Sequence, residues 1–272
     1  MCYANFLLFI TSITDEQTLI KFGYSFFPKK LSIYAYKYIF KAGATIIRAY
    51  GITFLVTIVG TTIHVLLAIL LAYPLSRKSL KGRNAISFYI FFTMLFNGGL
   101  VPSYLMWTQV FHIRDTIFAL LVPNLMLNAF NIIMMRNFFN NNVPVSLIEA
   151  AQIDMATEIQ ILFKVVLPIS KPIIATVGLM AGLAYWNDWM NGLYYLFKRT
   201  DLYGIQSVLN TMINNIQFLQ TQAASQGSDA IIGSLPSTSI RMAIAVVAII
   251  PIVIIYPFVQ KGFVKGIIVG SV

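Results

Sequence analysis

The sequence predicts an all-α, polytopic transmembrane helical bundle, and three observations carry that prediction. Hydrophobic residues make up 58% of the 272 residues and charged residues only 10%, whereas an ordinary soluble domain is about 25% charged. Mean hydropathy is +0.78. The apolar residues are gathered into runs long enough to cross a hydrocarbon core of about 30 Å as helices.

The same composition excludes several classes of protein. A soluble enzyme this apolar could not cover its surface with polar groups. Cys2 is the only cysteine, which excludes a disulfide scaffold. The net charge of +10 comes from bases that lie thinly between apolar runs. We therefore expect no nucleic-acid partner, because such proteins gather Lys and Arg on polar faces.

Five runs are long enough to span as helices, and one of them contains a single acid, Asp188. These runs are residues 51–76, 85–113, 116–135, 172–187 continuing to 197, and 242–260. Helices are expected because lipid requires every backbone group to be satisfied within the protein. In the second run, Asn97-Gly98-Gly99 followed by Pro102 predicts a break in the helix, which must border a cavity or protein.

The N-terminal residues 1–14 are uncharged and apolar but short for a span. We expect the outer part of a first transmembrane helix whose start is missing; the alternative is a genuine short anchor. On this interpretation residues 1–48 hold a partial first span and an outer loop, and residues 49–272 form the main transmembrane domain. The bundle then has five clear spans plus a partial first one.

Loop charges indicate the orientation. Four bases in residues 77–83 place that loop inside, because Lys and Arg favour the cytoplasmic side of short loops. Alternation then places residues 137–171 inside and 198–241 outside. The segment 15–48 carries six bases on the expected outer side, and long segments cross with less regard to charge.

The inner loop 137–171 is too polar to span and predicts two short helices joined near residues 154–156. Ser146 and Glu149 have capping-box spacing for the first helix. The second should begin near residues 156–158 and end at Leu167-Pro168. An interfacial amphipathic connector is the alternative. Three of the nine acids lie here, and acids fit an anionic membrane surface less well than a protein partner.

This loop resembles the EAA motif of permease subunits of binding-protein-dependent ATP-binding-cassette (ABC) importers. The matching residues are Glu149, Ala150, Ala151, Asp154, Ala156, Leu167 and Pro168. Residues 97–102, 186–189, 240–243 and 256–258 are similar to the maltose-transporter-type group, and within it to permeases for oligosaccharides and polysaccharide fragments. The resemblance implies a type I ABC importer permease fold for residues 49–272, with 137–171 as the coupling loop.

The resemblance also implies how the loop works. Its helices would dock on the ATP-hydrolysing subunit, with Glu149 meeting a basic group and Ala150 and Ala151 allowing close approach. Met155 stands where the family has glycine, so either the helix junction is not left-handed or coupling is weakened. The chain has no phosphate-binding Gly-x-x-x-x-Gly-Lys-Ser/Thr motif. ATP and magnesium are therefore expected on the partner, and no cofactor on this chain.

The implied assembly is a heterodimer of this chain with a second, homologous permease in the cytoplasmic membrane of a bacterium. Two ABC ATPase subunits and an extracytoplasmic solute-binding protein would complete it, and its substrate would be a sugar. The transmembrane chain would not itself be an enzyme. A self-contained secondary transporter or channel, and a decayed, inactive permease, are the alternatives.

Polar and aromatic residues inside the spans are the candidates for the substrate pathway. Helical spacing would place Tyr185, Asp188 and Trp189 on one face; Asp188 could instead cap backbone near the outer interface. Asn124 and Asn128 would form a polar stripe with Asn131, or interhelical hydrogen bonds. The remaining candidates are Trp186, Asn187 and Asn97. His64 is expected to pack within its span, and no catalytic or metal-binding set is predicted.

Overall fold

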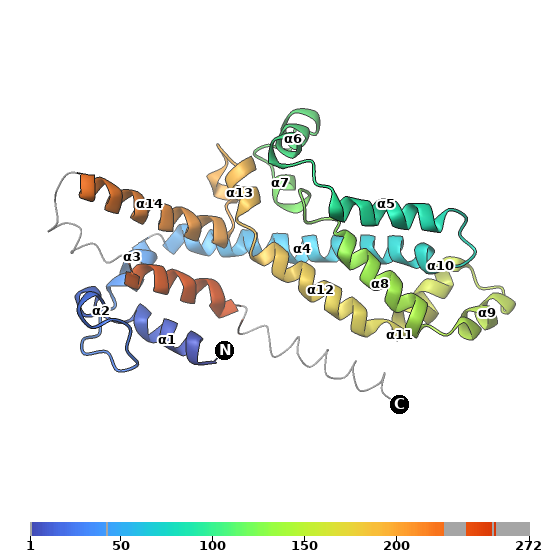
Figure 1. Ribbon diagram of the computed structural model, residues 1–272, viewed down its shortest axis with the longest axis horizontal. Coiled ribbons are helices and arrows are strands. Elements are labelled where there is room, and N and C mark those ends of the chain that lie inside the picture. Colours follow the sequence, from blue (N-terminus) through green and yellow to red (C-terminus); the bar gives the residue numbers. More distant parts are fainter. Residues whose placement is uncertain (1, 42, 226–237, 252, 254–272) are drawn as a thin grey trace. The chain divides into compact units, whose positions relative to one another are not determined.

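The computed structural model describes residues 2–41, 43–225, 238–251 and 253, which fold as helices (Figure 1). Contacts divide them into two compact units. One holds the described residues of Met1–Thr53, Asp188–Leu193 and Arg199–Tyr256. The other holds Phe54–Asn187 and Tyr194–Lys198. The predicted all-α class is confirmed.

The first unit contains α1 to α3, the beginning of α4, the beginning of α13, and α14. Their bounds are Cys2–Ser12, Glu16–Phe22, Tyr34–Lys41, Gly43–Ser76, Met190–Tyr195 and Ile205–Ser225, with a 3-10 turn at Thr200–Leu202 and a further helix at Thr238–Pro251. Glu16 is buried, and its carboxylate accepts hydrogen bonds from the backbone N–H groups of Thr238 and Ser239, both at 2.8 Å. The N-terminal segment is thereby fixed to the start of that last helix.

Helix α14 lies within residues 198–241, which were predicted as an outer loop. Ile205, Val208, Leu209 and Ile216 are buried at helical spacing, and the Gln and Asn residues lie mainly on its exposed or half-buried faces. At its start the Ile205 N–H donates to the Thr53 hydroxyl, 2.8 Å away. The rest of the predicted loop, residues 226–237, lies outside the described residues.

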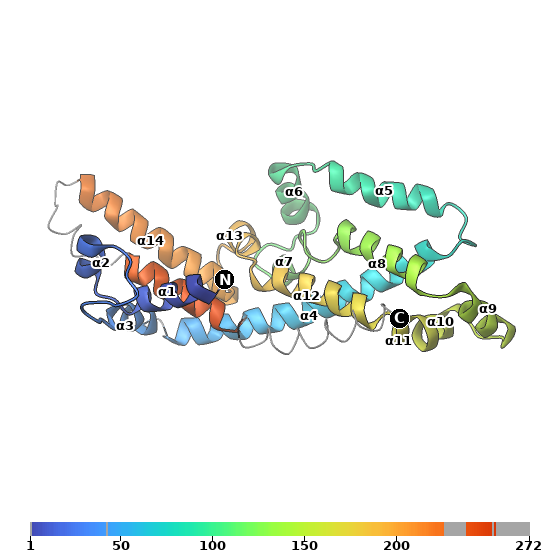
Figure 2. The same ribbon diagram turned by 60° about the horizontal axis from the view of Figure 1, so that its bottom comes forward.

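The second unit contains the remainder of α4 and the helices from α5 to α12. Their bounds are Arg83–Leu95 (α5), Leu100–Leu105 (α6), Phe118–Leu121 (α7), Ala129–Asn142 (α8), Val145–Ile153 (α9), Glu158–Ile161 (α10), Leu167–Ile169 (α11) and Lys171–Trp186 (α12). π-Helical turns, Met106–Val110 and Leu162–Val166, follow α6 and α10. Helices α4, α8 and α12 run beside one another in both views (Figures 1 and 2), and their core includes Ala72, Met135 and Val177.

Unbroken helices match the predicted spans only in part. Among the described residues, α4 alone is long and apolar enough to cross a membrane as a continuous helix; counting each sharply bent pair as a span raises the number to three. Helix α4 begins at Gly43 rather than 51, so Arg48 lies on it rather than in the outer loop. The fifth predicted span is described as a helix to Pro251, and its residues from 254 onward lie outside the described part.

The third predicted span, 116–135, is not one helix. Helix α7 ends at Leu121 and α8 begins at Ala129. Between them Pro123 lacks the N–H that would continue the helix, and Asn124 has a φ of 61°. Helix α8 then continues to Asn142, so the first residues of the predicted inner loop belong to it.

Candidate functional site

Helix α9 presents the predicted coupling residues outward. Ile148 is buried in the core of the second unit and anchors the helix. Glu149 and Ala150 are exposed, whereas Ala151 is half-buried against that core. The exposed side of α9 therefore pairs a carboxylate with a small residue, which permits close approach of another helix or groove.

The helix starts in this loop are set differently from the prediction. The Ser146–Glu149 capping box is wrong, because α9 begins at Val145 after Pro144 and makes no side-chain cap. A capping box is present at the second helix, between Thr157 and Gln160. That helix begins at Glu158, within the range predicted for it.

The junction between the two helices is left-handed at Met155, whose φ is 56°. The Met155 N–H donates to the Gln152 carbonyl, and the Ala156 N–H to the Ala151 carbonyl, both at 3.0 Å. This pair of bonds is the Schellman motif that ends many helices, usually with glycine at the left-handed position. Asp154 closes α9 just before it. The first of the two interpretations of Met155, that the junction is not left-handed, is therefore wrong.

The last two residues of the EAA motif, Leu167 and Pro168, lie at a bend between two helices. Leu167 packs against the core of the second unit, and Pro168 lies in the first turn of α11. Ser170 is buried where α11 meets α12, and the helices before and after it are bent by 84°. Leu167 and Pro168 thus lie where the coupling loop turns into α12.

A second feature of this unit is a cavity of about 360 Å³, within the size range of ligand pockets. It lies among α4, the 122–128 turn, α8 and α12. Its lining is formed by uncharged amides, one imidazole and apolar side chains: His64, Asn124, Leu125, Asn128, Phe130, Asn131, Met180, Ala181 and Ala184. Amides donate and accept hydrogen bonds, and apolar side chains suit the faces of a ring, so the lining can hold a hydroxyl-bearing ligand.

His64 does more than pack within its span, contrary to our expectation. It is buried, its Nδ1 lies 2.8 Å from the Leu125 carbonyl oxygen, and its Nε2 lies 2.9 Å from Nδ2 of Asn131. A carbonyl only accepts, so Nδ1–H donates to it and Nε2 accepts from the amide. No motif in the sequence pointed to this pairing.

The three asparagines are not a stripe along one helix. Asn124 lies in the turn with its left-handed φ, and Asn128 caps α8 by accepting from the Asn131 N–H. The fold nevertheless brings all three to the same cavity. Their contact with substrate stays a prediction.

The shared face predicted for Tyr185, Asp188 and Trp189 is not formed, because α12 ends at Trp186. The buried Tyr185 donates its hydroxyl hydrogen to the Leu121 carbonyl at 2.8 Å. Trp186 packs edge-to-face on the Phe54 ring, 5.1 Å between centroids. Both aromatic side chains thus pack inside the second unit, and neither lines the cavity.

The residues after α12 bind nearby backbone. The Asn187 side chain donates to the Leu183 carbonyl at 2.9 Å. Asp188 accepts from the Asn191 N–H at 3.2 Å, which matches the alternative in which it caps local backbone. Trp189 is partly exposed.

The break predicted at Asn97 is present. The side-chain Oδ1 of Asn97 accepts from the Gly99 N–H at 2.9 Å, and Gly99 has a φ of 86°. The helices before and after this turn are bent by 112°. Asn97 is exposed, and its side chain holds the turn.

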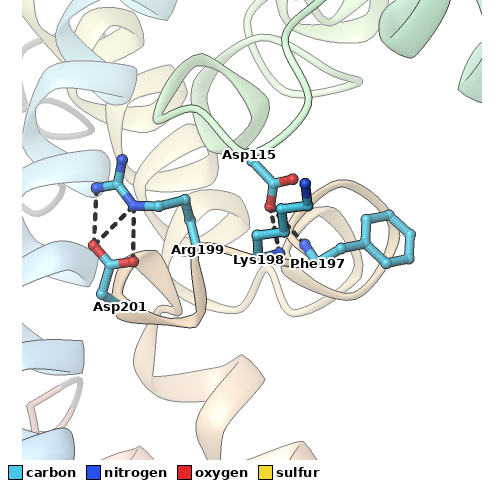
Figure 3. Close-up of polar contacts among 5 residues, drawn as sticks. All are labelled: Asp115, Phe197, Lys198, Arg199 and Asp201. Carbon is cyan, nitrogen blue, oxygen red and sulfur yellow. Dashed lines mark hydrogen bonds and ion pairs between the residues drawn. The ribbon is translucent and has the colours of Figure 1, made fainter.

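Two further sets of polar contacts lie near the start of the predicted outer loop (Figure 3). In the second unit, the Asp115 carboxylate accepts from the Phe197 and Lys198 N–H groups at 2.7 and 2.8 Å. In the first unit, the Arg199 guanidinium binds Asp201 through two nitrogens, each at 2.8 Å. Hydrogen bonding to Arg199 lowers the pKa of the Asp201 carboxyl below its usual value. The Asp115 carboxylate thus fixes a short segment of backbone, whereas Asp201 binds a side chain.

Residues 64–269 match the family described as the binding-protein-dependent transport system inner membrane component. The chain belongs to this family. It is 36% identical over 261 residues to protein LplC of Bacillus subtilis (strain 168), covering 96% of this chain and 85% of the relative. It is 37% identical over 273 residues to the polygalacturonan/rhamnogalacturonan transport system permease protein YtcP of the same strain, covering 100% and 93%.

A solved structure is also similar: a bacterial ABC transporter involved in the import of the acidic polysaccharide alginate. The TM-score is 0.78 at 29% identity, covering 95% of this chain and 89% of the other. The predicted family and fold are confirmed. The chain is an inner-membrane permease component of a binding-protein-dependent ABC transport system.

Proposed function

We propose that this binding-protein-dependent permease carries a sugar, and specifically an oligosaccharide, into the cell. YtcP is named for transport of polygalacturonan and rhamnogalacturonan, and the structural relative for import of alginate. The cavity supports the same substrate class, because its amides and apolar side chains suit the hydroxyls and ring faces of a sugar. In this proposal Asn124 and Asn128 contact substrate, with His64 holding Asn131 in place.

The driving force comes from ATP hydrolysed on partner subunits. The observation that carries this step is the outward presentation of Glu149 and Ala150 on α9, an element anchored in the core through Ile148. A charge-assisted contact between Glu149 and a basic group of an ATPase would move α9 as a rigid element. Exposed apolar side chains beside it, Ile153 and Ile159, support the same docking surface.

The complete importer contains a second, homologous permease, two ATPase subunits and an extracytoplasmic binding protein. Many apolar side chains of α5 and α6 are exposed, among them Phe88, Leu95 and Val101. In a membrane assembly lipid or a second permease would cover them. The chain itself would hold no ATP, magnesium or other cofactor and would perform no catalysis.

The test is reconstitution of the chain with its co-expressed partners in proteoliposomes. Fluorescent or radiolabelled fragments of rhamnogalacturonan and polygalacturonan serve as substrates. We expect uptake that needs ATP on the ATPase side and the binding protein on the other. Uptake driven by a proton or sodium gradient without ATP, or failure to purify with any ABC ATPase, would contradict the proposal.

A further inference from the structure

Glu158, the first residue of α10, contacts side chains from two other helices. One of its carboxylate oxygens accepts the hydroxyl hydrogen of Tyr73 on α4. The other lies 3.7 Å from Nη2 of Arg77, just after α4, and accepts from Nε2 of Gln152 on α9 at 3.3 Å. We call these four residues the Glu158 cluster. It joins both helices of the coupling loop to the inner end of α4.

The α4 side of the cluster is held firmly. Tyr73 is buried, the Arg77 side chain is only 16% exposed, and the Arg77 guanidinium lies over the Tyr73 ring at 5.9 Å. On the same turn the Leu75 carbonyl accepts from Nε of Arg136 on α8, at 3.1 Å. The Glu158 side chain is 55% exposed. Tyr73 and Arg77 are therefore the sheltered side of the cluster, and the Glu158 carboxylate and Gln152 its exposed side.

Stability alone gives a weak reason for the cluster. Ile161, Leu162 and Val166 already bury the second coupling helix and the turn after it in the core. An ion pair as exposed as Glu158 with Arg77 contributes little to folding, since solvent screens it. Apolar packing alone lets helices slide along one another. Hydrogen bonds to the Glu158 carboxylate instead fix the positions of α4, α9 and α10 relative to one another. These contacts are therefore suited to pass a movement of α9 and α10 on to α4.

We propose that Glu158 is a positioning residue that couples movement of the α9–α10 loop to α4. It holds Tyr73 and Arg77 in register with Gln152, so displacement of α9 displaces the inner end of α4. Helix α4 also carries His64, which lines the cavity, so the cluster lies at the inner end of an element that reaches the cavity. The inference rests on the proposed function, because it concerns the step between ATP hydrolysis and transport.

The test measures sugar transported per ATP hydrolysed by the complete complex in proteoliposomes. Glu158→Ala should lower this ratio about tenfold, a typical coupling between two sites. Tyr73→Phe, which removes one hydroxyl and keeps the ring, should lower it by a smaller factor. Glu158→Gln keeps an acceptor for Tyr73 and should restore part of the ratio. A purely structural role would reduce the amount of complex and leave the ratio unchanged.

Gln160→Ala is the matched control. It removes the capping-box partner of Thr157 from the same helix end without touching the Glu158 cluster, so the ratio should stay at the wild-type value. If Glu158→Ala fails to assemble, Tyr73→Phe and Glu158→Gln decide the question. Wild-type ratios in both would overturn the inference while leaving the proposed function intact. Absence of ATP-driven uptake in the wild type would overturn both.

Discussion

Nε2 of His64 and the side-chain amide of Asn131 are hydrogen-bonded at 2.9 Å, and both residues are buried. His64 lies on α4 and Asn131 on α8, the helix that leads into the coupling loop. The second ring nitrogen binds the Leu125 carbonyl in the turn before α8. One imidazole therefore fixes two neighbouring elements, and it does so beside the cavity.

Removing this imidazole should destabilise the second unit. His64→Leu leaves the Asn131 amide and the Leu125 carbonyl without their partner. Hydrogen bonds between membrane helices contribute about 0.6 to 1.7 kcal/mol, so we expect a loss of about 1 kcal/mol in the free energy of unfolding. A double-mutant cycle with Asn131→Leu, read by denaturation in detergent, measures the pair directly. Strictly additive effects would show that the two side chains do not stabilise each other.

Gly60 should not tolerate a side chain. A Cβ there would lie 2.5 Å from Cζ of Tyr185, whose ring is buried and whose hydroxyl binds Leu121. Gly60→Ala must therefore displace the ring, and overpacking of this kind costs about 1 to 3 kcal/mol. Gly178→Ala is the control on the facing helix, because its Cβ would meet nothing nearer than Val65 at 3.8 Å. Equal melting temperatures for the two variants would contradict the packing.

Relieving the left-handed backbone at Met155 should help the coupling loop. A side chain at this φ costs about 1 to 2 kcal/mol, which Met155→Gly removes. Met155→Ala keeps the backbone penalty and removes the bulk of a side chain that is already 90% exposed. We expect uptake by the glycine variant to equal or exceed that of the wild type, and the alanine variant to match the wild type. Absence of oligosaccharide transport by both the wild type and the glycine variant would favour the alternative of a decayed permease.

Substituting Asn124 with glycine should remove a cavity-lining amide without disturbing the turn. Glycine adopts its φ of 61° freely, so Asn124→Gly removes the side-chain amide and keeps the backbone. We expect the KM for sugar uptake to rise about tenfold, the loss of one or two hydrogen bonds of about 1 kcal/mol each. ATP hydrolysis without sugar should stay at the wild-type rate. An unchanged KM would place the substrate elsewhere.

Local patterns in the sequence predicted the coupling loop well. The apolar spacing around Ile148 and the residues at 154–156 specify two helices and the junction between them, because helix ends depend on neighbouring residues. The break after Asn97 followed from Gly and Pro for the same reason. The first cap was misplaced, since Pro144 started the helix before Ser146 could cap it, and α8 extends into the start of the predicted loop.

The remaining features depend on contacts that no local pattern encodes. Hydropathy gave 116–135 as one span, because it counts apolar residues and overlooks a turn at Pro123 and Asn124. Helix α14 was missed because its apolar positions are spread among many Gln, Asn and Ser residues. His64 meets partners 61 and 67 residues away in the chain. Glu158 likewise meets Tyr73 across 85 residues, so its position could not be inferred from spacing.

The most direct test of the central claim compares ATP-driven uptake by the wild-type complex with that of Glu149→Lys. Reversing the exposed charge on α9 should abolish uptake, because it sets a cation against the basic group proposed on the ATPase. Glu149→Gln, which keeps the shape of the side chain, should retain part of it. The account predicts sugar accumulation that requires ATP and is lost in Glu149→Lys. Undiminished, ATP-dependent accumulation in that variant would contradict it.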